Sequence, residues 1–142
     1  MTKVVLIAAP FLSLQRPALG LSLLQAALAE RRIDCDLRYL NLDYADFEDP
    51  DLCQTLSQSV PTHHLLGEWI FSHLVRGPDD AAPLDRGWDW VTSSVIPAFA
   101  ERMMAAKTRA VAFVERSAQA ILEAEPDHVG FSSSFQQNCA SL

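Results

Sequence analysis

Positive charge is scarce in this sequence. Its 142 residues carry 11 Lys and Arg against 18 Asp and Glu, which gives a net charge of −7. A nucleic-acid partner requires a basic face that neutralises phosphate groups, and an anionic membrane surface attracts proteins in the same way. The sequence contains no cluster of Lys and Arg that would form such a face. We therefore expect neither a nucleic acid nor a membrane as a partner.

Long apolar runs and cysteines are also few. No segment approaches the roughly 18 continuous apolar residues of a membrane-spanning helix, and the N-terminal apolar run is too short for a signal peptide. The three cysteines (Cys35, Cys53 and Cys139) are odd in number and far apart, as in proteins that keep their thiols reduced. Because 49% of the residues are apolar, a sizeable core is expected. These properties predict a globular, cytoplasmic protein with one domain, spanning residues 1–142.

The common phosphate-binding and catalytic motifs are absent. Neither GxGxxG nor GxxxxGK(S/T) occurs, which weakens the hypothesis of an ordinary nucleotide-binding Rossmann domain. No arrangement of Ser, Cys, His and Asp indicates an activated nucleophile. His64 and Glu68 are four residues apart on a predicted helix and would share one face. We expect a hydrogen-bonded surface pair there rather than a metal site.

The first part of the chain has the pattern of a βαβ unit. Residues 3–9 form a continuous apolar run, which is typical of a strand buried on both faces of a parallel sheet. A helix is predicted over residues 17–32, because Pro17 suits a first turn and apolar residues recur on one face. A second strand is predicted over residues 35–42. The residues expected to face the sheet are Leu19, Leu23, Leu24, Ala27 and Leu28, with Gln25 outside that face.

The second part contains one strongly periodic segment. A long helix is predicted over residues 98–123, and a third strand begins at His128. Residues 43–97 are predicted to form a helical insertion, with an acidic turn-rich start and helices at 62–75 and 88–97. The fold predicted is α/β, a partial Rossmann-like, three-layer parallel sheet with this insertion after its second strand. The buried face of the long helix is predicted to comprise Phe99, Met103, Ala106, Ala110, Phe113, Ser117 and Ile121, and the acidic residues expected in a solvated loop are Asp43, Asp46, Glu48, Asp49 and Asp51.

Two loops occupy the position where ligands bind in such folds. Open parallel sheets bind ligands beyond the carboxyl ends of their strands. The loop at residues 10–17 follows the first strand, and the loop at residues 132–138 follows the third. The second loop offers hydroxyls from three serines and amides from Gln136, Gln137 and Asn138, which suit a ligand rich in amide or hydroxyl groups. Alternatively, the serines only cap the helix that starts near Gln136.

Three segments carry a resemblance to a known family. They are RPALGLSLLQAAL after the first strand, LLGEWIF in the insertion, and VGFSSSFQQNCASL at the end. In this order they closely resemble the N-terminal region of the radical S-adenosylmethionine proteins that mature ribosomally synthesised peptides. GEWIF together with GFSSSFQQN is the more specific part, since the P-x-L-G-L motif occurs widely in cobalamin-dependent radical enzymes. The resemblance implies a cobalamin-binding-like Rossmann domain that precedes a radical catalytic domain.

The resemblance also implies a site and its cofactor. In related domains the loops after the first and third strands line the corrin of cobalamin. No histidine lies in either loop, so cobalamin would bind here without histidine ligation of cobalt. The resemblance suggests that Arg16 would contact a corrin amide or the nucleotide phosphate, and that Phe135 would pack on the macrocycle. The implied cofactor-binding residues are Pro10, Phe11, Arg16, Pro17, Gly20, Ser132, Ser133, Ser134, Phe135, Gln136, Gln137 and Asn138.

Catalysis by this chain alone is not expected. Radical chemistry in the family requires a CxxxCxxC arrangement that holds a 4Fe-4S cluster for S-adenosylmethionine, and Cys35, Cys53 and Cys139 lack that spacing. The full-length family members are C-methyltransferases acting on a precursor peptide, so this chain would be a fragment or a truncated form that supplies part of the cofactor cradle. The alternative is a stand-alone, cofactor-free interaction module that forms a homo-oligomer through its open sheet edge.

Overall fold

The structure is a computed structural model that describes residues 2–77, 89, 92–93 and 97–142. Within the insertion, residues 78–88 and most of the short helix expected at residues 88–97 lie outside the described residues. All three expected strands and the long helix fall within them.

The centre of the fold is a three-stranded, all-parallel sheet. Its strands are β1 (Lys3–Ala8), β2 (Asp34–Tyr39) and β3 (His128–Ser132), in the order β2-β1-β3. The central strand β1 is the most deeply buried, as its continuous apolar sequence predicts. Both neighbours run parallel to it, with Leu6 paired to Leu37 on one side and to Gly130 on the other. The predicted α/β fold with a Rossmann-like parallel sheet is confirmed.

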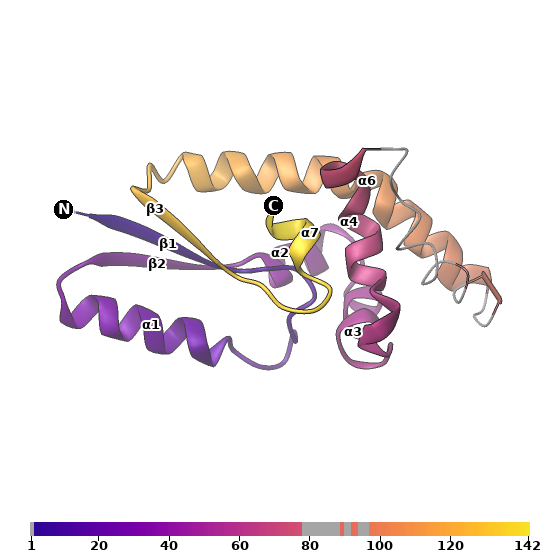
Figure 1. The fold of residues 1–142 in the computed structure, drawn as a ribbon, viewed down its shortest axis with the longest axis horizontal. Coiled ribbons are helices and arrows are strands. Elements are labelled where there is room, and N and C mark those ends of the chain that lie inside the picture. The colour runs from indigo at the N-terminus through magenta and orange to yellow at the C-terminus, as the bar shows by residue number, and fades with distance from the viewer. Residues whose placement is uncertain (1, 78–88, 90–91, 94–96) are drawn as a thin grey trace.

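Helices cover both faces of the sheet. Helix α1 (Leu19–Glu30) lies on one face and helix α6 (Pro97–Leu122) on the other (Figure 1). Alternate residues of β1 serve the two layers: Leu6 packs with Leu21 of α1, whereas Val5 and Ile7 belong to the larger core beneath α6. The predicted long helix is confirmed to within one residue at each end. Its predicted stripe is also confirmed, with Met103, Ala106, Ala110, Phe113 and Ser117 buried and Phe99 and Ile121 half-buried.

The predicted contact face of α1 is wrong for four of its five residues, since only Leu28 packs on the sheet and Ala27 is among the exposed ones. Leu21 is buried at 8% exposure, and Leu28 packs beside it. Leu23, which the pattern assigned to the contact face, is 62% exposed, and Leu19 and Leu24 are exposed as well. Gln25, placed outside that face, points to β2, where its Nε2 donates a hydrogen bond to the Cys35 carbonyl at 2.9 Å. Apolar residues surround most of this helix, so its periodicity alone did not identify the contact face.

The acidic segment after β2 is helical rather than turn-rich. Strand β2 ends at Tyr39, three residues before the predicted end, and helix α2 (Leu40–Phe47) follows at once. Helix α3 (Pro50–Gln58) comes next, and Asp49 caps it by accepting hydrogen bonds from the main-chain N–H groups of Asp51 at 2.9 Å and Leu52 at 3.3 Å. The prediction of an acidic turn is therefore wrong, because tertiary packing and a strong N-cap outweigh the composition.

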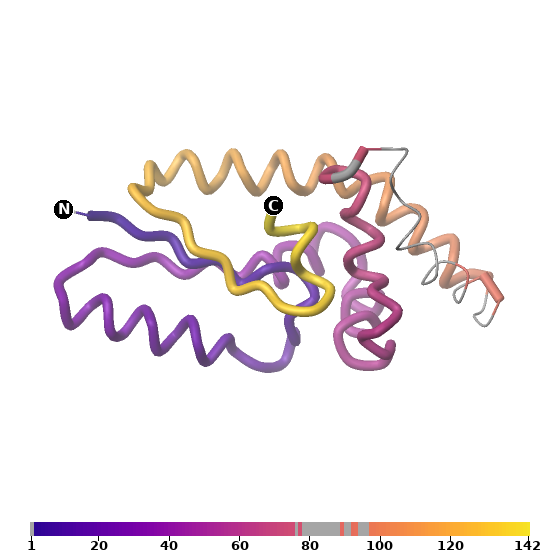
Figure 2. The backbone as a smooth tube through the Cα atoms, in the orientation of Figure 1, coloured from indigo at the N-terminus to yellow at the C-terminus, as the bar shows by residue number. Residues whose placement is uncertain are grey.

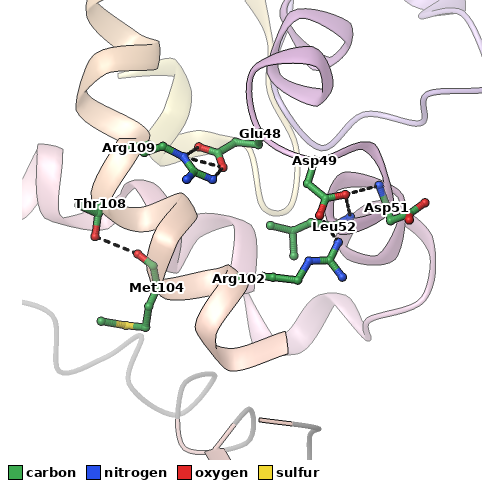
Figure 3. Close-up of polar contacts among 8 residues, drawn as sticks. All are labelled: Glu48, Asp49, Asp51, Leu52, Arg102, Met104, Thr108 and Arg109. Carbon is green, nitrogen blue, oxygen red and sulfur yellow. Dashed lines mark hydrogen bonds and ion pairs between the residues drawn. The ribbon is translucent and has the colours of Figure 1, made fainter. Parts of the chain in front are cut away.

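Two of the acidic residues tie the insertion to α6. The Arg109 guanidinium pairs with Glu48, and Arg102 pairs with Asp49 at 2.5 Å (Figure 3). The side chain of Glu48 is completely covered, so this carboxylate is not part of a solvated loop. Since the two arginines lie on one helix and the two carboxylates are adjacent, the pairs hold α6 against the junction of α2 and α3.

The insertion continues in two unequal pieces. A single 3-10 turn, η1 (Thr62–His64), is followed by helix α4 (Leu66–Arg76). Leu65 between them has a left-handed backbone with φ 51°, which breaks the one helix predicted over residues 62–75. His64 and Glu68 consequently lie on different elements, and the predicted pair on a common helix face is wrong. Helices α3 and α4 stand at the carboxyl end of the sheet (Figure 2), and α4 contacts the last helix, α7 (Asn138–Ser141).

Candidate ligand-binding site

The loop after β1 begins in the core. Phe11 has a left-handed backbone with φ 68°, and its ring packs edge-on against Tyr44 and Phe71, with ring centroids 5.4 and 5.9 Å away. It is buried, as is the preceding Pro10. Both had been assigned to the cofactor by resemblance. Here Phe11 instead joins the first strand to α2 and α4, which are parts of the insertion.

The loop after β3 is held by the same insertion. Gln136 is buried, and its Oε1 accepts a hydrogen bond from the Gly67 main-chain N–H at 3.1 Å. Its Nε2 donates to the Leu56 carbonyl at 3.1 Å, so one side chain bridges α3 and α4. Gly67 is required by this contact, because a Cβ there would lie 2.7 Å from Gln136 Cβ, Gln136 O and Phe11 Cδ2.

Glu68 completes the attachment. Its Oε1 accepts hydrogen bonds from the main-chain N–H and the Nδ2 of Asn138, both at 2.9 Å, and its Oε2 accepts one from the Cys139 N–H at 2.7 Å. The carboxylate is buried and sits at the positive end of α7, where an anion is favoured. Capping of this helix therefore comes from α4, across the fold, and not from the serines.

The serines make bonds within their own loop. The Ser134 hydroxyl and main-chain N–H both donate to Gln137 Oε1, at 3.2 and 3.1 Å, and Ser133 Oγ donates to Asn138 Oδ1 at 2.9 Å. Gln137 is buried, whereas Ser133 and Ser134 remain exposed. Of the twelve residues implied by resemblance, the exposed ones are Arg16, Pro17, Gly20, Ser133, Ser134, Phe135 and Asn138, while Ser132 is half-buried.

The first loop lines a cavity of about 330 Å³ at the carboxyl end of β1 and β2. Arg16 and Pro17 form one wall of it, and Tyr39 and Asn41 form another. Asn41 is only 1% exposed; its Nδ2 donates to the Ser13 carbonyl at 3.2 Å, while its Oδ1 has no partner among the described residues. Asn41 was missed by sequence reasoning, which placed it in a strand. Its position just after β2, at the ligand-binding edge, was the signal that pointed to it.

The second loop lines a different cavity. Phe135, which is 73% exposed, and Asn138 border a space of about 400 Å³ together with Leu65 and Val75 of the insertion. The sequence predicted one site formed by both loops. The structure places each loop beside its own cavity, because α3 and α4 pack against the buried part of both loops.

Two buried groups beneath these loops, the Cys53 thiol and the Tyr44 phenol, keep their protons at neutral pH. Burial raises the pKa of the Cys53 thiol to about 12, with Glu48 adding to the effect. Burial, and then the charge of Glu48, also raises the pKa of the Tyr44 phenol far above its ordinary value. Neither group is poised as a nucleophile or a general base near neutral pH. Within the described ranges, no three His, Cys, Asp or Glu side chains come together in a group that would hold a metal ion. The site can bind through charge, hydroxyl and amide groups.

In the part of the chain that the structure describes, no helix has both the length and the apolar character needed to cross a membrane. Comparison with known proteins found no matching family model, no matching curated protein and no matching solved structure.

Proposed function

We propose that this chain is the N-terminal cobalamin-binding-like domain of a radical S-adenosylmethionine C-methyltransferase that matures ribosomal peptides. In this role it supplies part of a cofactor cradle and performs no catalysis alone. The precursor peptide, S-adenosylmethionine and the 4Fe-4S cluster belong to the full-length enzyme. The parallel sheet, with loops from two adjacent strands at its carboxyl end, supports the proposal at the level of the fold.

One observation carries the proposal beyond the fold. The two most specific segments of the resemblance, GEWIF and GFSSSFQQN, are far apart in the sequence but form a single hydrogen-bonded unit. Gly67 and Glu68 from the first segment bond directly to Gln136 and Asn138 from the second. The two segments are structurally complementary. Gly67 leaves room for Gln136, and the Glu68 carboxylate caps α7. This unit stands at the end of the sheet where a ligand would bind.

The residues fit cobalamin only in part. Phe11 and Gln136 are enclosed by the fold, and contact with a cofactor would break their contacts with the helices of the insertion. Gln137 is buried as well, and its Oε1 accepts hydrogen bonds from Ser134 of its own loop. The cradle is therefore limited to the exposed residues of the two loops, with Arg16 available to an anionic or amide group and Phe135 available to a flat apolar face. When bound in the full-length enzyme, methylcobalamin would supply the methyl group that is transferred.

The test is binding of hydroxocobalamin to the purified chain. We expect corrin absorbance to elute with the protein in gel filtration. We expect Arg16→Ala and Phe135→Ala each to lower the affinity for hydroxocobalamin about tenfold or more. Arg31→Ala is the matched control, since Arg31 is exposed at the other end of α1. If the protein is folded and all the corrin elutes separately from it, the proposal is overturned.

A second candidate is a cofactor-free interaction module. Two observations favour it. Phe11, Gln136 and Gln137 are buried in the fold and do not face a ligand, and β3 exposes apolar side chains. A folded protein that binds no corrin but self-associates would support this candidate. Corrin binding by a monomer would contradict it.

A further inference from the structure

The cavity at the carboxyl end of β1 and β2 has a buried acceptor without a donor. Asn41 lines this cavity of about 330 Å³ and is only 1% exposed. Its Nδ2 donates to the Ser13 carbonyl at 3.2 Å, but its Oδ1 is shielded from solvent and accepts no hydrogen bond among the described residues. Leaving a buried acceptor unpaired costs free energy. A ligand that brings an N–H or O–H group into the cavity would remove this cost.

A cation lies at the wall of the same cavity. Arg16 borders the cavity, is exposed and forms no ion pair with any described carboxylate. By contrast, Arg38, Arg102 and Arg109 each pair with an Asp or Glu. In a chain with net charge −7, the charge of Arg16 is therefore available to a ligand. A guanidinium suits phosphate in particular, because it can donate two parallel hydrogen bonds to it.

The remaining walls of the cavity are largely apolar. Leu14, Pro17 and Leu42 line it together with the aromatic residue Tyr39. Apolar and aromatic walls around a few polar groups are typical of small-molecule sites, whose volumes begin at about 300 Å³. This cavity lies at the lower end of that range, so it suits a small ring system and not a macrocycle.

Asn41 also occupies a position that binds sugars in related architectures. In dinucleotide-binding folds, an acidic side chain that follows the first turn and its crossover helix accepts a hydrogen bond from a ribose hydroxyl. Asn41 comes after the first loop, α1 and β2, and its Oδ1 offers an acceptor without a charge. We propose that this cavity binds a nucleoside monophosphate. A ribose hydroxyl donates to Asn41 Oδ1, the phosphate pairs with Arg16, and the base packs on the apolar wall.

The phosphate is held differently from that in the common nucleotide-binding motifs. The sequence has neither GxGxxG nor GxxxxGK(S/T), so no such glycine-rich turn presents its main-chain N–H groups to a phosphate. At this site the Arg16 side chain takes their place. A nucleotide site can therefore exist without the glycine motifs, and because Arg16 is exposed, the binding should weaken as salt is added.

This site is independent of the corrin-binding proposal. It consists of the first loop and the start of α2, whereas Phe135 borders the other cavity, of about 400 Å³. Arg16 and Pro17 are shared by the two proposals, but Asn41 belongs to this site alone. The binding test is made without cobalamin, so either proposal can fail while the other stands.

The first experiment titrates the purified chain with adenosine 5′-monophosphate (AMP) in a calorimeter. We expect saturable binding at one site, with a dissociation constant below about 1 mM. Adenosine lacks the phosphate, and 2′,3′-dideoxyadenosine 5′-monophosphate lacks the ribose hydroxyls, so each should bind about tenfold or more weakly. Arg16→Ala should weaken the binding of AMP about tenfold and leave the binding of adenosine unchanged. Arg31→Ala, at the other end of α1, is the matched control and should alter neither.

The second experiment tests the acceptor. Folded Asn41→Ala should bind AMP and its dideoxy form with equal affinity, because no side-chain oxygen remains to recognise the hydroxyl. A merely structural role of Asn41 would weaken both ligands and keep the preference for AMP. Circular dichroism establishes whether the variant is folded; if it is not, the comparison of the two nucleotides on the wild type decides.

Three outcomes would overturn the site. They are the absence of saturable AMP binding to the folded wild type, equal affinity of the wild type for AMP and its dideoxy form, and a folded Asn41→Ala that still prefers AMP.

Discussion

Glu68 on α4 holds Asn138 at the start of α7 through two hydrogen bonds of 2.9 Å, one to the main chain and one to the side chain. With the third bond, to the Cys139 N–H, this buried carboxylate satisfies three donors. We expect Glu68→Gln to destabilise the fold by about 1–3 kcal/mol, because an amide has only one acceptor oxygen and would turn an N–H toward a main-chain donor. Urea unfolding followed by circular dichroism measures the difference.

The control for this change is Glu115→Gln on the exposed side of α6. The same chemical change there should alter the free energy of unfolding by less than about 0.5 kcal/mol. Equal effects of the two substitutions would show that Glu68 contributes nothing special to the attachment of α7.

Gly67 and Gly20 give opposite predictions for the same substitution. Gly67→Ala forces a Cβ to within 2.7 Å of Gln136 and Phe11, so we expect a loss of about 1–3 kcal/mol or more. Gly20→Ala meets no atom within 4 Å and lies in α1, so it should stabilise the protein by about 0.5–1 kcal/mol. Thermal unfolding should show midpoints that shift in opposite directions. A neutral Gly67→Ala would contradict the close approach between α4 and the loop after β3.

The lowered pKa of Asp49 should make the stability of the fold depend on pH. Partial burial acts to raise the pKa of its carboxyl, but the hydrogen bonds from Leu52, Asp51 and Arg102 outweigh it and lower the pKa below its ordinary value. The stabilisation is therefore present above the unfolded pKa, about 3.9, and is lost as the pH falls through the lower folded pKa. Asp49→Asn keeps a capping oxygen but removes the charge. It should cost about 0.5 kcal/mol at pH 7, a small amount because the pair is partly exposed.

The difference between this variant and the wild type should shrink as the pH falls below the unfolded pKa and disappear below the lowered folded pKa, where the wild-type carboxyl is also protonated. Asp46→Asn, at an exposed position of α2, serves as the control. Urea unfolding at a series of pH values measures both. A cost that persists unchanged in acid would assign the effect to the shape of the side chain and not to its charge.

Leu21 and Leu23 test which face of α1 packs on the sheet. Leu21→Ala removes a buried side chain between α1 and β1, and we expect a loss of about 2–5 kcal/mol. Leu23→Ala changes a side chain that is mostly in solvent, so the expected change is within about 0.5 kcal/mol. If Leu23→Ala proved the more destabilising, the face expected from the sequence would be the packed one.

Regular elements with a clear pattern could be predicted from the sequence. The long helix α6 repeats apolar residues at helical spacing from Phe99 to Ile121, and β1 is a continuous apolar run between polar segments. Both patterns arise from local geometry, because a helix or strand presents the same face at a fixed interval wherever it packs. The location of the loops at the carboxyl end of the sheet followed from the parallel order of the strands in the same way.

The details that failed depend on contacts between distant segments. Nothing in the local sequence distinguishes Leu21 from Leu23 on a helix that is apolar nearly all round. Packing against β1 determines that Leu21 is the buried one. The acidic residues after β2 favour a turn by composition, yet Glu48 and Asp49 face two arginines of α6. Long-range ion pairs of this kind leave no periodic signal in the sequence.

By itself, the sequence determined the parallel α/β scaffold and the position of the two loops, because alternation and helical spacing are properties of each segment. Only the tertiary structure decided what the loop side chains do. It enclosed Phe11 and Gln136 and left Arg16 and Phe135 exposed, since α3 and α4 pack against part of the carboxyl edge. A polar side chain in a loop can bind a ligand or another part of the chain, and only the neighbours that folding brings to it distinguish the two.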